Sequence, residues 1–486
     1  MIRHLIGGKW VESAETLQNF NPATGEVIGE IAEASPAQVD DAVRAAKEAF
    51  PAWSRMPVKQ RSRLIEKIGD AIAASVDEIA RLETRDTGLT ISLTRDTLIP
   101  RAADNFYFFA EMSRRMNGET YPVDDVMLNY TLYQPVGVCG LISPWNVPFM
   151  TGTWKVAPSL ALGNTAVLKV SELSPLTADK LGQIVTDVGL PPGVLNIVHG
   201  RGSVTGDALV VNKDVRVVSF TGGTRTGEQI TRRAGLKRLS MELGGKSPVL
   251  VFEDADLSRA LDASLFTIFS INGERCTAGS RIFVQESVYD GFVAEFAQRA
   301  SRIVVGDPMD DATQVGALIS RDHLAKVSGY IDIGREEGAR VVAGGGRPAH
   351  LPKHLEHGNF LSPTVMVDVT NGMRCAQEEI FGPVVCIIPF KDEADALRMA
   401  NDSCYGLAAY LWTENNSRIM RLSRQIEAGM VFVNSQNVRD LRQPFGGVKM
   451  SGIGREGGAF ALEAYAEVKN ICMSGGAHAI PRWGVG

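Results

Sequence analysis

The chain has 486 residues, 44% of them hydrophobic and 22% charged, which is the composition of a globular protein with two or three domains. The formal net charge of −6 argues against nucleic acid as a partner, and there is no apolar run of about 18 residues to predict a membrane span. The six cysteines and seven histidines show neither a disulfide framework nor metal-ligand spacing. The N-terminal apolar stretch is too short for a signal peptide, so we expect a cytoplasmic protein without a metal site.

The first part of the chain is predicted to be mainly helical. Ser35-Pro36 is a hydroxyl cap followed by proline at the first helical position, and apolar residues from Val39 to Phe50 recur at helical spacing. Further helices are expected over 61–84 and 101–116, and a strand over 127–132 is expected to belong to a hairpin outside the main core.

From residue 136 onward, strand-like and helix-like segments alternate, which predicts an α/β fold with parallel sheets and right-handed crossovers. Such sheets bind ligands beyond the carboxyl ends of their strands. In the first series we expect strands over 136–142, 165–170, 194–198 and 215–220, with helices over 147–162 and 176–188. In the second we expect helices over 256–270 and 289–303, with strands over 282–285, 384–389, 408–413 and 430–434.

One cysteine stands in a stretch that suits chemistry. Cys276 follows Arg275 and is surrounded by small residues, so a second molecule can approach its sulfur. Gly273 and Gly279 would permit tight turns on either side. A lone cysteine is more often a small buried hydrophobe, and reactivity needs a polarising, partly open setting. This stretch alone therefore leaves both interpretations open.

Two predicted strands end in motifs that suit a dinucleotide. After the strand that ends at Phe220, Gly222 and Gly223 would let a phosphate approach a helix N-terminus, although the Gly-x-Gly-x-x-Gly spacing is absent. Lys169 and Glu172 end another strand and could hydrogen-bond ribose hydroxyls, with the carboxylate favouring NAD over NADP. Taken alone, each motif is more often a structural corner or a solvated ion pair.

Two further motifs suit catalysis. In the run from Ser143 to Phe149, two prolines lock the loop and leave the Asn146 amide as a fixed donor for a developing oxyanion. In Met241–Lys246, Glu242 is bracketed by apolar residues and glycines. A desolvated carboxylate there would have a raised pKa and could act as a general base.

In this order the motifs resemble the aldehyde dehydrogenase superfamily over nearly the whole chain, and Glu378–Pro383 and Pro444–Gly452 add to the resemblance. It implies the aldehyde dehydrogenase fold, with an atypical Rossmann NAD-binding domain over 1–117 and 136–244 and an α/β catalytic domain over 245–446. It further implies an oligomerisation β-hairpin over 118–135, joined by the C-terminal tail over 447–486, and a homodimer or homotetramer.

The resemblance also implies a mechanism. Cys276 would attack an aldehyde, Asn146 and the Cys276 N–H would hold the oxyanion, and hydride transfer to NAD would leave a thioester. Glu242 would activate the water that hydrolyses the thioester. Lys155 would lie near the proton path to Glu242 or form a structural ion pair. The residues implied to bind NAD are Ile142, Ser143, Trp145, Lys169, Glu172, Phe220, Gly222, Gly223, Thr226, Leu243, Glu379 and Phe381.

The chain resembles one branch of this superfamily more closely than the others. Members of that branch oxidise semialdehydes from aromatic-compound breakdown. The stretches that carry this resemblance are Leu98–Phe106, Tyr121–Asp125, Phe269–Val284, Val438–Phe445 and Pro481–Val485. The implied substrate, 5-carboxymethyl-2-hydroxymuconate semialdehyde, is anionic because it carries two carboxylates.

Such a substrate needs cationic partners. We expect Arg101 and Arg439, or Arg442, to bind its carboxylates, and Trp154 to line the aldehyde tunnel. The competing role of these arginines is a solvated or interface charge. Open alternatives are 2-hydroxymuconic, 2-aminomuconic or succinate semialdehyde as substrate, a broad-specificity aldehyde dehydrogenase, and a non-catalytic structural relative.

Overall fold

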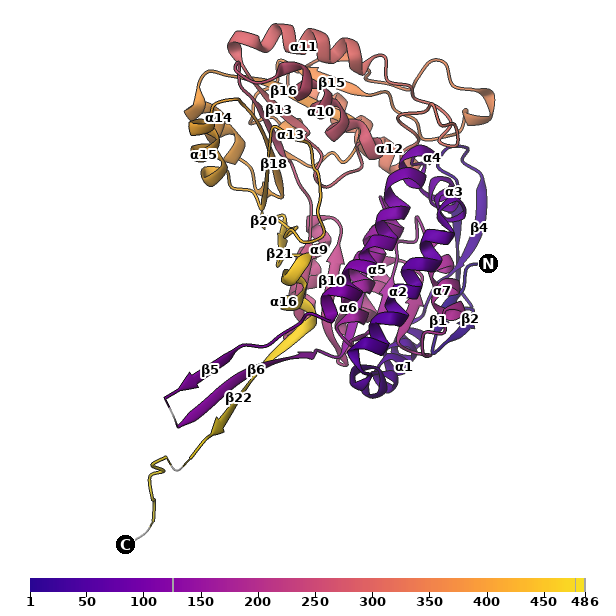
Figure 1. Ribbon diagram of the computed structural model, residues 1–486. Coiled ribbons are helices and arrows are strands. Elements are labelled where there is room, and N and C mark those ends of the chain that lie inside the picture. Colours follow the sequence, from indigo (N-terminus) through magenta and orange to yellow (C-terminus); the bar gives the residue numbers. More distant parts are fainter. Residues whose placement is uncertain (125, 477, 485–486) are drawn as a thin grey trace.

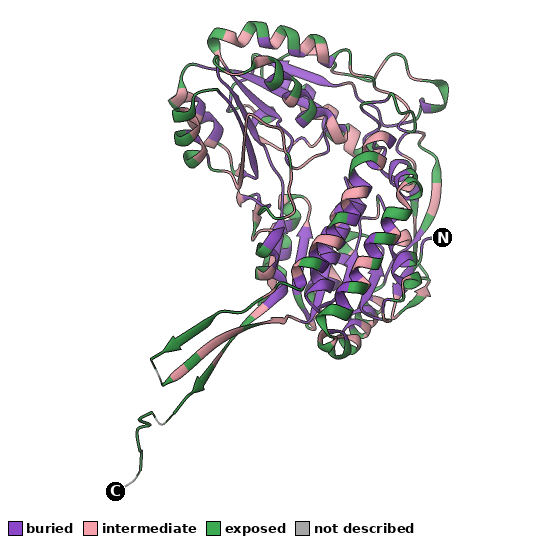
Figure 2. Ribbon diagram, in the orientation of Figure 1, coloured by how far each residue is buried: buried purple, intermediate pink, exposed green. Residues whose placement is uncertain are grey.

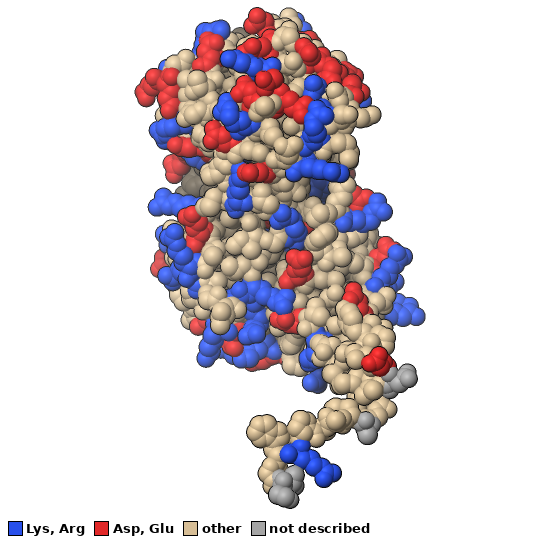
Figure 3. Space-filling view, turned by 90° about the vertical axis from the view of Figure 1, so that its left-hand side faces the viewer, with Lys and Arg blue, Asp and Glu red and all other residues tan. Residues whose placement is uncertain are grey.

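The computed structural model describes residues 1–124, 126–476 and 478–484. Parts of three predictions lie outside these residues: Asp125 in the predicted hairpin, residues 477, 485 and 486 in the predicted tail, and Val485 in the branch resemblance. No helix in the described ranges is long and apolar enough to cross a bilayer. Acidic and basic side chains are interspersed over the face drawn in Figure 3.

Two large sheets form the centres of two lobes (Figure 1). The first has the strand order β2-β1-β9-β8-β7-β10-β11-β21, and β9, β8, β7, β10 and β11 run parallel. Its strands are β1 (His4–Ile6), β2 (Lys9–Val11), β7 (Val138–Ile142), β8 (Thr165–Lys169), β9 (Leu195–Val198), β10 (Val215–Thr221), β11 (Arg238–Glu242) and β21 (Gly452–Ile453).

The second sheet has the order β14-β15-β16-β13-β12-β18-β19, in which all pairs except β14–β15 are parallel. Its strands are β12 (Pro248–Val251), β13 (Arg281–Gln285), β14 (Arg340–Ala343), β15 (Thr364–Val367), β16 (Val384–Phe390), β18 (Ala408–Trp412) and β19 (Met430–Val433). The predicted α/β fold with parallel sheets is therefore confirmed.

Helices cover both faces of each sheet, so every residue of strands such as β7 and β8 is buried, as expected of a parallel sheet (Figure 2). On the first sheet one face packs against α2 (Val58–Ala74), α5 (Ile99–Ser113), α6 (Pro148–Ala161) and α7 (Leu176–Asp187), and the other against α1 (Pro36–Arg55), α8 (Asp207–Val211) and α9 (Thr224–Arg233). On the second, one face packs against α10 (Leu257–Phe269) and α11 (Glu286–Ala300), and the other against α12 (Arg321–Glu336), α13 (Arg374–Gln377), α14 (Glu393–Asn401) and α15 (Asn416–Gln425).

Local sequence explains how α1 begins, but it did not predict where α2 ends. At Ser35 the hydroxyl accepts from the Gln38 N–H and the Gln38 side chain accepts from the Ser35 N–H, so both partners of a capping box are present. The helical structure predicted over 61–84 is confirmed except for one break, at Ser75 (φ −117°, ψ 19°), which separates α2 from α3 (Val76–Thr87). No glycine or proline marks this break.

A thin arm projects from the lower lobe (Figure 1). It is a three-stranded antiparallel sheet of β5 (Thr120–Val123), β6 (Met127–Pro135) and β22 (Ala466–Ser474), in the order β22-β6-β5. The C-terminal segment thus returns to the hairpin. Most of the arm is exposed (Figure 2), so it has no core of its own.

Candidate active site

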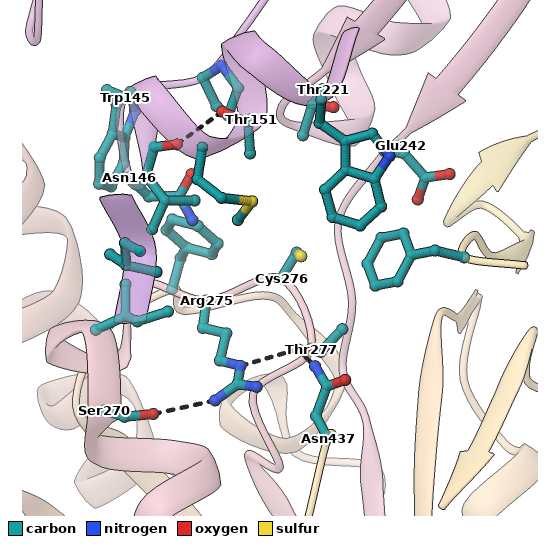
Figure 4. Close-up of a pocket in the computed structure, with 18 of the residues that line it drawn as sticks. Trp145, Asn146, Thr151, Thr221, Glu242, Ser270, Arg275, Cys276, Thr277 and Asn437 are labelled. Atoms are coloured by element: carbon teal, nitrogen blue, oxygen red, sulfur yellow. Dashed lines mark hydrogen bonds between the residues drawn. The ribbon is translucent and has the colours of Figure 1, made fainter. Parts of the chain in front are cut away.

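A cavity of about 570 Å³ is lined by residues of both lobes. Its lining includes Asn146, Glu242 and Cys276, which are far apart in the sequence. Figure 4 shows Cys276 at the centre of the cavity, between Asn146 on one side and Glu242 on the other. The fold therefore brings together a thiol, an amide donor and a carboxylate.

A strained loop carries Cys276 into the cavity. Ile271, Asn272 and Gly273 all have left-handed backbones, with φ of 57°, 54° and 72°. The Asn272 side chain holds this conformation, because its Nδ2 donates to the carbonyls of Gly88 (3.1 Å) and Ala317 (3.0 Å). A Cβ on Gly273 would lie 2.3 Å from the carbonyl carbon of Gly382, so only glycine fits.

Gly279 lies in a tight turn, as predicted, and also has a second role. The Ser280 N–H donates to the Ala278 carbonyl at 2.8 Å across Gly279, although the backbone of this glycine does not have a positive φ. A Cβ on Gly279 would lie 2.6 Å from Cγ2 of Val249 in β12. This glycine therefore lets the cysteine loop pack closely against the second sheet.

Two hydrogen-bond donors face the thiol. The Asn146 Nδ2 donates to the Glu274 carbonyl oxygen at 2.7 Å, which fixes the amide and leaves its second N–H free. The backbone N–H of Cys276 has no acceptor in the part of the chain that the structure describes. Burial, and then the Glu242 charge, raise the pKa of the thiol to about 11, although Arg275 acts in the opposite direction. Arg275 therefore favours the thiolate, but burial outweighs its effect.

Glu242 ends β11 and is deeply buried. Neither carboxylate oxygen has a hydrogen-bond partner among the described residues. Burial, and then the charge of Glu456, raise the pKa of Glu242 well above its usual value, which confirms the predicted desolvation. Gly446, with φ of 153°, packs against this carboxylate, because a Cβ there would lie 2.8 Å from Glu242 Oε1.

Lys155 forms an ion pair beside Glu242. From α6, its Nζ donates to Glu456 Oε1 at 2.6 Å and to Ser219 Oγ at 3.0 Å, and its side chain is 1% exposed. The structure therefore shows the structural ion pair, but it places this pair next to the carboxylate at the cavity. Sequence reasoning did not identify Glu456; the only signal was its position just after the Pro444–Gly452 motif.

The carboxyl ends of neighbouring strands align along one edge. Ile142 of β7 is in register with Lys169 of β8 and with Phe220 of β10. The Ser143 N–H donates to the Lys169 carbonyl at 3.0 Å, and the Lys169 ammonium pairs with Glu172 at 3.1 Å. These five residues, Ile142, Ser143, Lys169, Glu172 and Phe220, do not line the central cavity. The residues predicted to bind NAD therefore continue from the cavity along the ends of the strands.

The start of α9 lies on the same edge. Gly222 must be small, since a Cβ there would lie 2.5 Å from the Phe220 ring, whereas nothing lies within 4 Å of a Cβ on Gly223. The first turn of α9 is therefore open in front of its backbone N–H groups. Thr226 is exposed on this turn, and Gly222, Gly223 and Leu243 line the cavity.

We call the wall formed by Gly222, Gly223, Gly244, Glu379 and Phe381 the glycine side of the cavity. The Gly245 N–H donates to Glu379 Oε1 at 2.8 Å, and a Cβ on Gly244 would lie 2.5 Å from Glu379 Oε2. This carboxylate is therefore held by backbone.

An aromatic cluster borders the glycine side. The ring centroid of Trp145 lies 5.0 Å from that of His323 and 5.3 Å from that of Phe381. The His323 Nε2 is 2.7 Å from the Phe381 carbonyl oxygen. Sequence reasoning missed His323, which lies inside α12 and in no motif.

We call a second group of lining residues, Arg101, Trp154, Arg275, Arg439 and Phe445, the arginine side. The Arg439 Cζ lies 3.4 Å from the Trp154 ring centroid and 3.8 Å from that of Phe445, and the Arg101 Cζ lies 5.9 Å from Trp154. Within residues 1–124, 126–476 and 478–484, none of the three arginines has a carboxylate within 4.0 Å.

Arg442 is placed elsewhere. Its side chain is 80% exposed and pairs with Asp440, and it does not line the cavity. Of the two alternatives predicted beside Arg101, the structure therefore favours Arg439 over Arg442 as a residue that can reach a molecule in the cavity.

Comparisons with known proteins agree with this geometry. The sequence pattern described as "Aldehyde dehydrogenase family" matches residues 10–471. The chain is 64% identical to 5-carboxymethyl-2-hydroxymuconate semialdehyde dehydrogenase of Escherichia coli over 461 residues, which is 95% of this chain and 98% of that protein.

Solved structures of related proteins superpose closely on this chain. HpcC from Thermus thermophilus superposes with a TM-score of 0.98 at 49% identity, over 100% of this chain and 95% of that one. PnpE from Pseudomonas sp. WBC-3 superposes with 0.96 at 39% identity over 99% of both chains. A structure of PnpE in complex with nicotinamide adenine dinucleotide gives 0.97 at 40% identity, over 99% of this chain and 100% of that one. The chain belongs to the aldehyde dehydrogenase family of oxidoreductases.

Proposed function

We propose that this aldehyde dehydrogenase oxidises a dicarboxylic semialdehyde, with NAD as the oxidant and Cys276 as the nucleophile. The observation that carries the proposal is the arginine side, where three guanidinium groups without carboxylate partners among the described residues face the cavity that holds the thiol. Such groups suit a substrate that brings its own carboxylates. The name of the Escherichia coli relative supports 5-carboxymethyl-2-hydroxymuconate semialdehyde as that substrate.

The strand-end edge and the glycine side fit NAD. The open first turn of α9 suits a pyrophosphate, because its backbone N–H groups and the helix dipole favour negative charge. Lys169 and Glu172 suit the hydroxyls of one ribose, and Glu379 those of the other. When bound there, NAD supplies the acceptor for the aldehyde hydride. A related structure, that of PnpE, is described as a complex with this dinucleotide.

The thiol side of the reaction follows from the groups around Cys276. The Cys276 thiolate adds to the aldehyde carbon, and the oxygen of the thiohemiacetal becomes negatively charged. The free N–H of Asn146 and the backbone N–H of Cys276 then stabilise this oxyanion, by about 3 kcal/mol for one such donor. Because Asn146 is already fixed by Glu274, little reorganisation is needed.

Glu242 acts on the thioester that remains after oxidation. Its carboxylate takes a proton from water, whose oxygen attacks the thioester carbon and releases the acid and Cys276. The raised pKa of Glu242 makes it a stronger base than an exposed glutamate. Lys155, paired with Glu456, places a positive charge near Glu242 that favours its ionised form.

The proposal is tested with the purified protein and three aldehydes: the dicarboxylic semialdehyde, succinate semialdehyde and neutral hexanal. We expect NADH formation with the highest kcat/KM on the dicarboxylic substrate, and none above background with Cys276→Ser. Arg439→Gln and Arg101→Gln should each lower kcat/KM about 10- to 100-fold more on the dicarboxylic substrate than on hexanal. Equal losses on both substrates would show that these arginines do not bind carboxylates.

We also propose that the arm joins copies of this chain into a dimer or tetramer. Its edge strands β5 and β22 each have one side unpaired among the described residues, and Val468 (57% exposed) and Leu132 (41%) present apolar surface. Light scattering coupled to gel filtration should give a mass of two or four chains. We expect Val468→Asp to shift the mass toward one chain, and a monomeric unmodified protein would contradict the proposal.

A further inference from the structure

The arginine side contains two separate positive groups. Arg101 and Arg439 both contact the Trp154 ring and so form one group. Arg275 lies on the cysteine loop, where its neighbours are Ser270, Thr277 and the Phe266 ring. Figure 4 shows the Arg275 side chain extending away from Thr221 and Cys276, with its guanidinium between Ser270 and Thr277.

The guanidinium of Arg275 is oriented by neutral partners. Its Nε donates to Thr277 Oγ1 at 3.0 Å and its Nη1 donates to Ser270 Oγ at 3.1 Å. Asn437 Nδ2 also donates to Thr277 Oγ1, at 2.9 Å, so this hydroxyl is itself held in place. A guanidinium has five N–H groups, which leaves three on Arg275 without these partners.

The charge of Arg275 is not neutralised by protein. No carboxylate among the described residues lies within 4.0 Å of it, although it lines the cavity. Burial, then the charge of Arg275, lower the pKa of Arg101, so the two cations are close enough to repel each other. Gathering such charges costs stability, and carboxylates bound to them would reduce this cost.

We propose that Arg275 forms a second carboxylate-binding subsite, distinct from the Arg101–Arg439 pair, which makes the chain selective for dicarboxylic over monocarboxylic semialdehydes. The inference rests on the proposed function, because it assigns the second carboxylate of that substrate. Arg101 and Arg439 bind one carboxylate beside Trp154, and Arg275 binds the other next to the thiol. The hydroxyls of Ser270 and Thr277 orient the guanidinium before the substrate enters.

The test compares Arg275→Gln with the unmodified enzyme on three aldehydes: hexanal, the monocarboxylic 6-oxohexanoate, and the dicarboxylic semialdehyde. We expect kcat/KM on the dicarboxylic substrate to fall about 10- to 100-fold more than on 6-oxohexanoate, mainly through KM. Arg275→Lys keeps the charge but loses the planar fork, so it should restore part of the preference. Arg302→Gln, at an exposed arginine outside the cavity, is the matched control and should change neither ratio.

Other outcomes separate the two proposals. A uniform loss on all three aldehydes would overturn the subsite, because Arg275 would then act only on the thiol or the loop. If the unmodified enzyme prefers hexanal to both acids, the proposed function itself fails. Inhibition by adipate, a dicarboxylate without an aldehyde group, measures binding independently of catalysis. Its inhibition constant should rise about tenfold or more in Arg275→Gln, and that of hexanoate should not.

Discussion

The two sides of the cavity solve opposite electrostatic problems. On the glycine side, a carboxylate is held by the backbone N–H of Gly245, and small residues leave room in front of a helix terminus. On the arginine side, cations stack on aromatic rings and have no anion among the described residues. The carboxylate of the glycine side is thus hydrogen-bonded by a neutral backbone group. The guanidinium groups of the arginine side have no negative charge beside them until an anionic ligand binds.

This difference teaches where selectivity comes from. Hydrogen-bond acceptors such as Glu379 recognise hydroxyls and can be common to many aldehyde oxidations. Unpaired arginines recognise only anions, and they pay for it with repulsion when the cavity is empty. The charges of Glu379 on one side and of Arg275 and Arg439 on the other all act on the Cys276 thiol, so each side can be altered while the other is used as the control.

The largest effect expected among the following changes is from Glu242→Gln, which removes the base but keeps the shape of the side chain. Turnover should fall about 10²- to 10⁴-fold because the thioester is no longer hydrolysed. In rapid mixing, a burst of NADH equal to the enzyme concentration should survive. Loss of the burst along with turnover would mean that Glu242 is needed before the thioester forms.

Asn146→Ala should lower kcat about 10²- to 10³-fold, since one oxyanion donor is lost. The burst rate should fall along with the steady-state rate, unlike in Glu242→Gln, because the thiohemiacetal forms more slowly. The same loss is expected with hexanal and with the dicarboxylic semialdehyde, as the donor belongs to neither side of the cavity. A loss confined to one of these substrates would contradict that placement.

Glu379→Gln tests the independence of the two sides. We expect the KM for NAD to rise about tenfold, because a charged hydrogen-bond acceptor becomes neutral, with little change in the KM for the aldehyde. Arg439→Gln should raise the KM for the aldehyde with little change in the KM for NAD. Each variant therefore serves as the control for the other. If both variants raised both constants equally, the two sides would not be separable.

The smallest effect on catalysis is expected at a buried carboxylate that belongs to neither side of the cavity and that acts on stability instead. Glu83 Oε2 accepts from the Phe149 N–H at the start of α6, and burial raises the pKa of Glu83 to about 8. Between the pKa of the unfolded chain, near 4.5, and 8, the folded state binds the proton more tightly, so stability falls as pH rises. Glu83→Gln should abolish this part of the decline, which is a few kcal/mol at most. Melting temperatures of the two proteins should diverge from pH 5 to pH 8; parallel curves would contradict the assignment.

The elements predicted most accurately from the sequence are the strands that are buried on both faces of the sheet. Strands β7, β8 and β10 were placed to within two residues, because their apolar runs leave no alternative to a covered parallel sheet. The short strands β1 and β2 were not predicted, since each has three residues and no readable periodicity. The break at Ser75 was missed because neither glycine nor proline marks it in the sequence.

In the site, residues at strand ends and in glycine-rich loops were predictable, as Glu242, Asn146 and Cys276 show. His323 and Glu456 were not, because they lie outside these motifs, in the first turn of α12 and in a late segment, and reach the cavity through tertiary packing. Arg275 was identified in sequence as a neighbour of the thiol, but its hydroxyl partners and the lack of a carboxylate needed coordinates.

The segment that closes around Glu242 also sets when the enzyme can become active during its synthesis. Gly446 packs against the carboxylate, Gly452 pairs with Glu242 in the sheet, and Glu456 holds Lys155. Gly446 follows Cys276 by 170 residues (446 − 276), so ribosomes translating about 5–20 residues per second make it roughly 10 to 30 seconds later. A nascent chain therefore carries its nucleophile well before it has the surroundings of its base. Hydrolytic competence is therefore gained only once the chain has been made as far as Glu456.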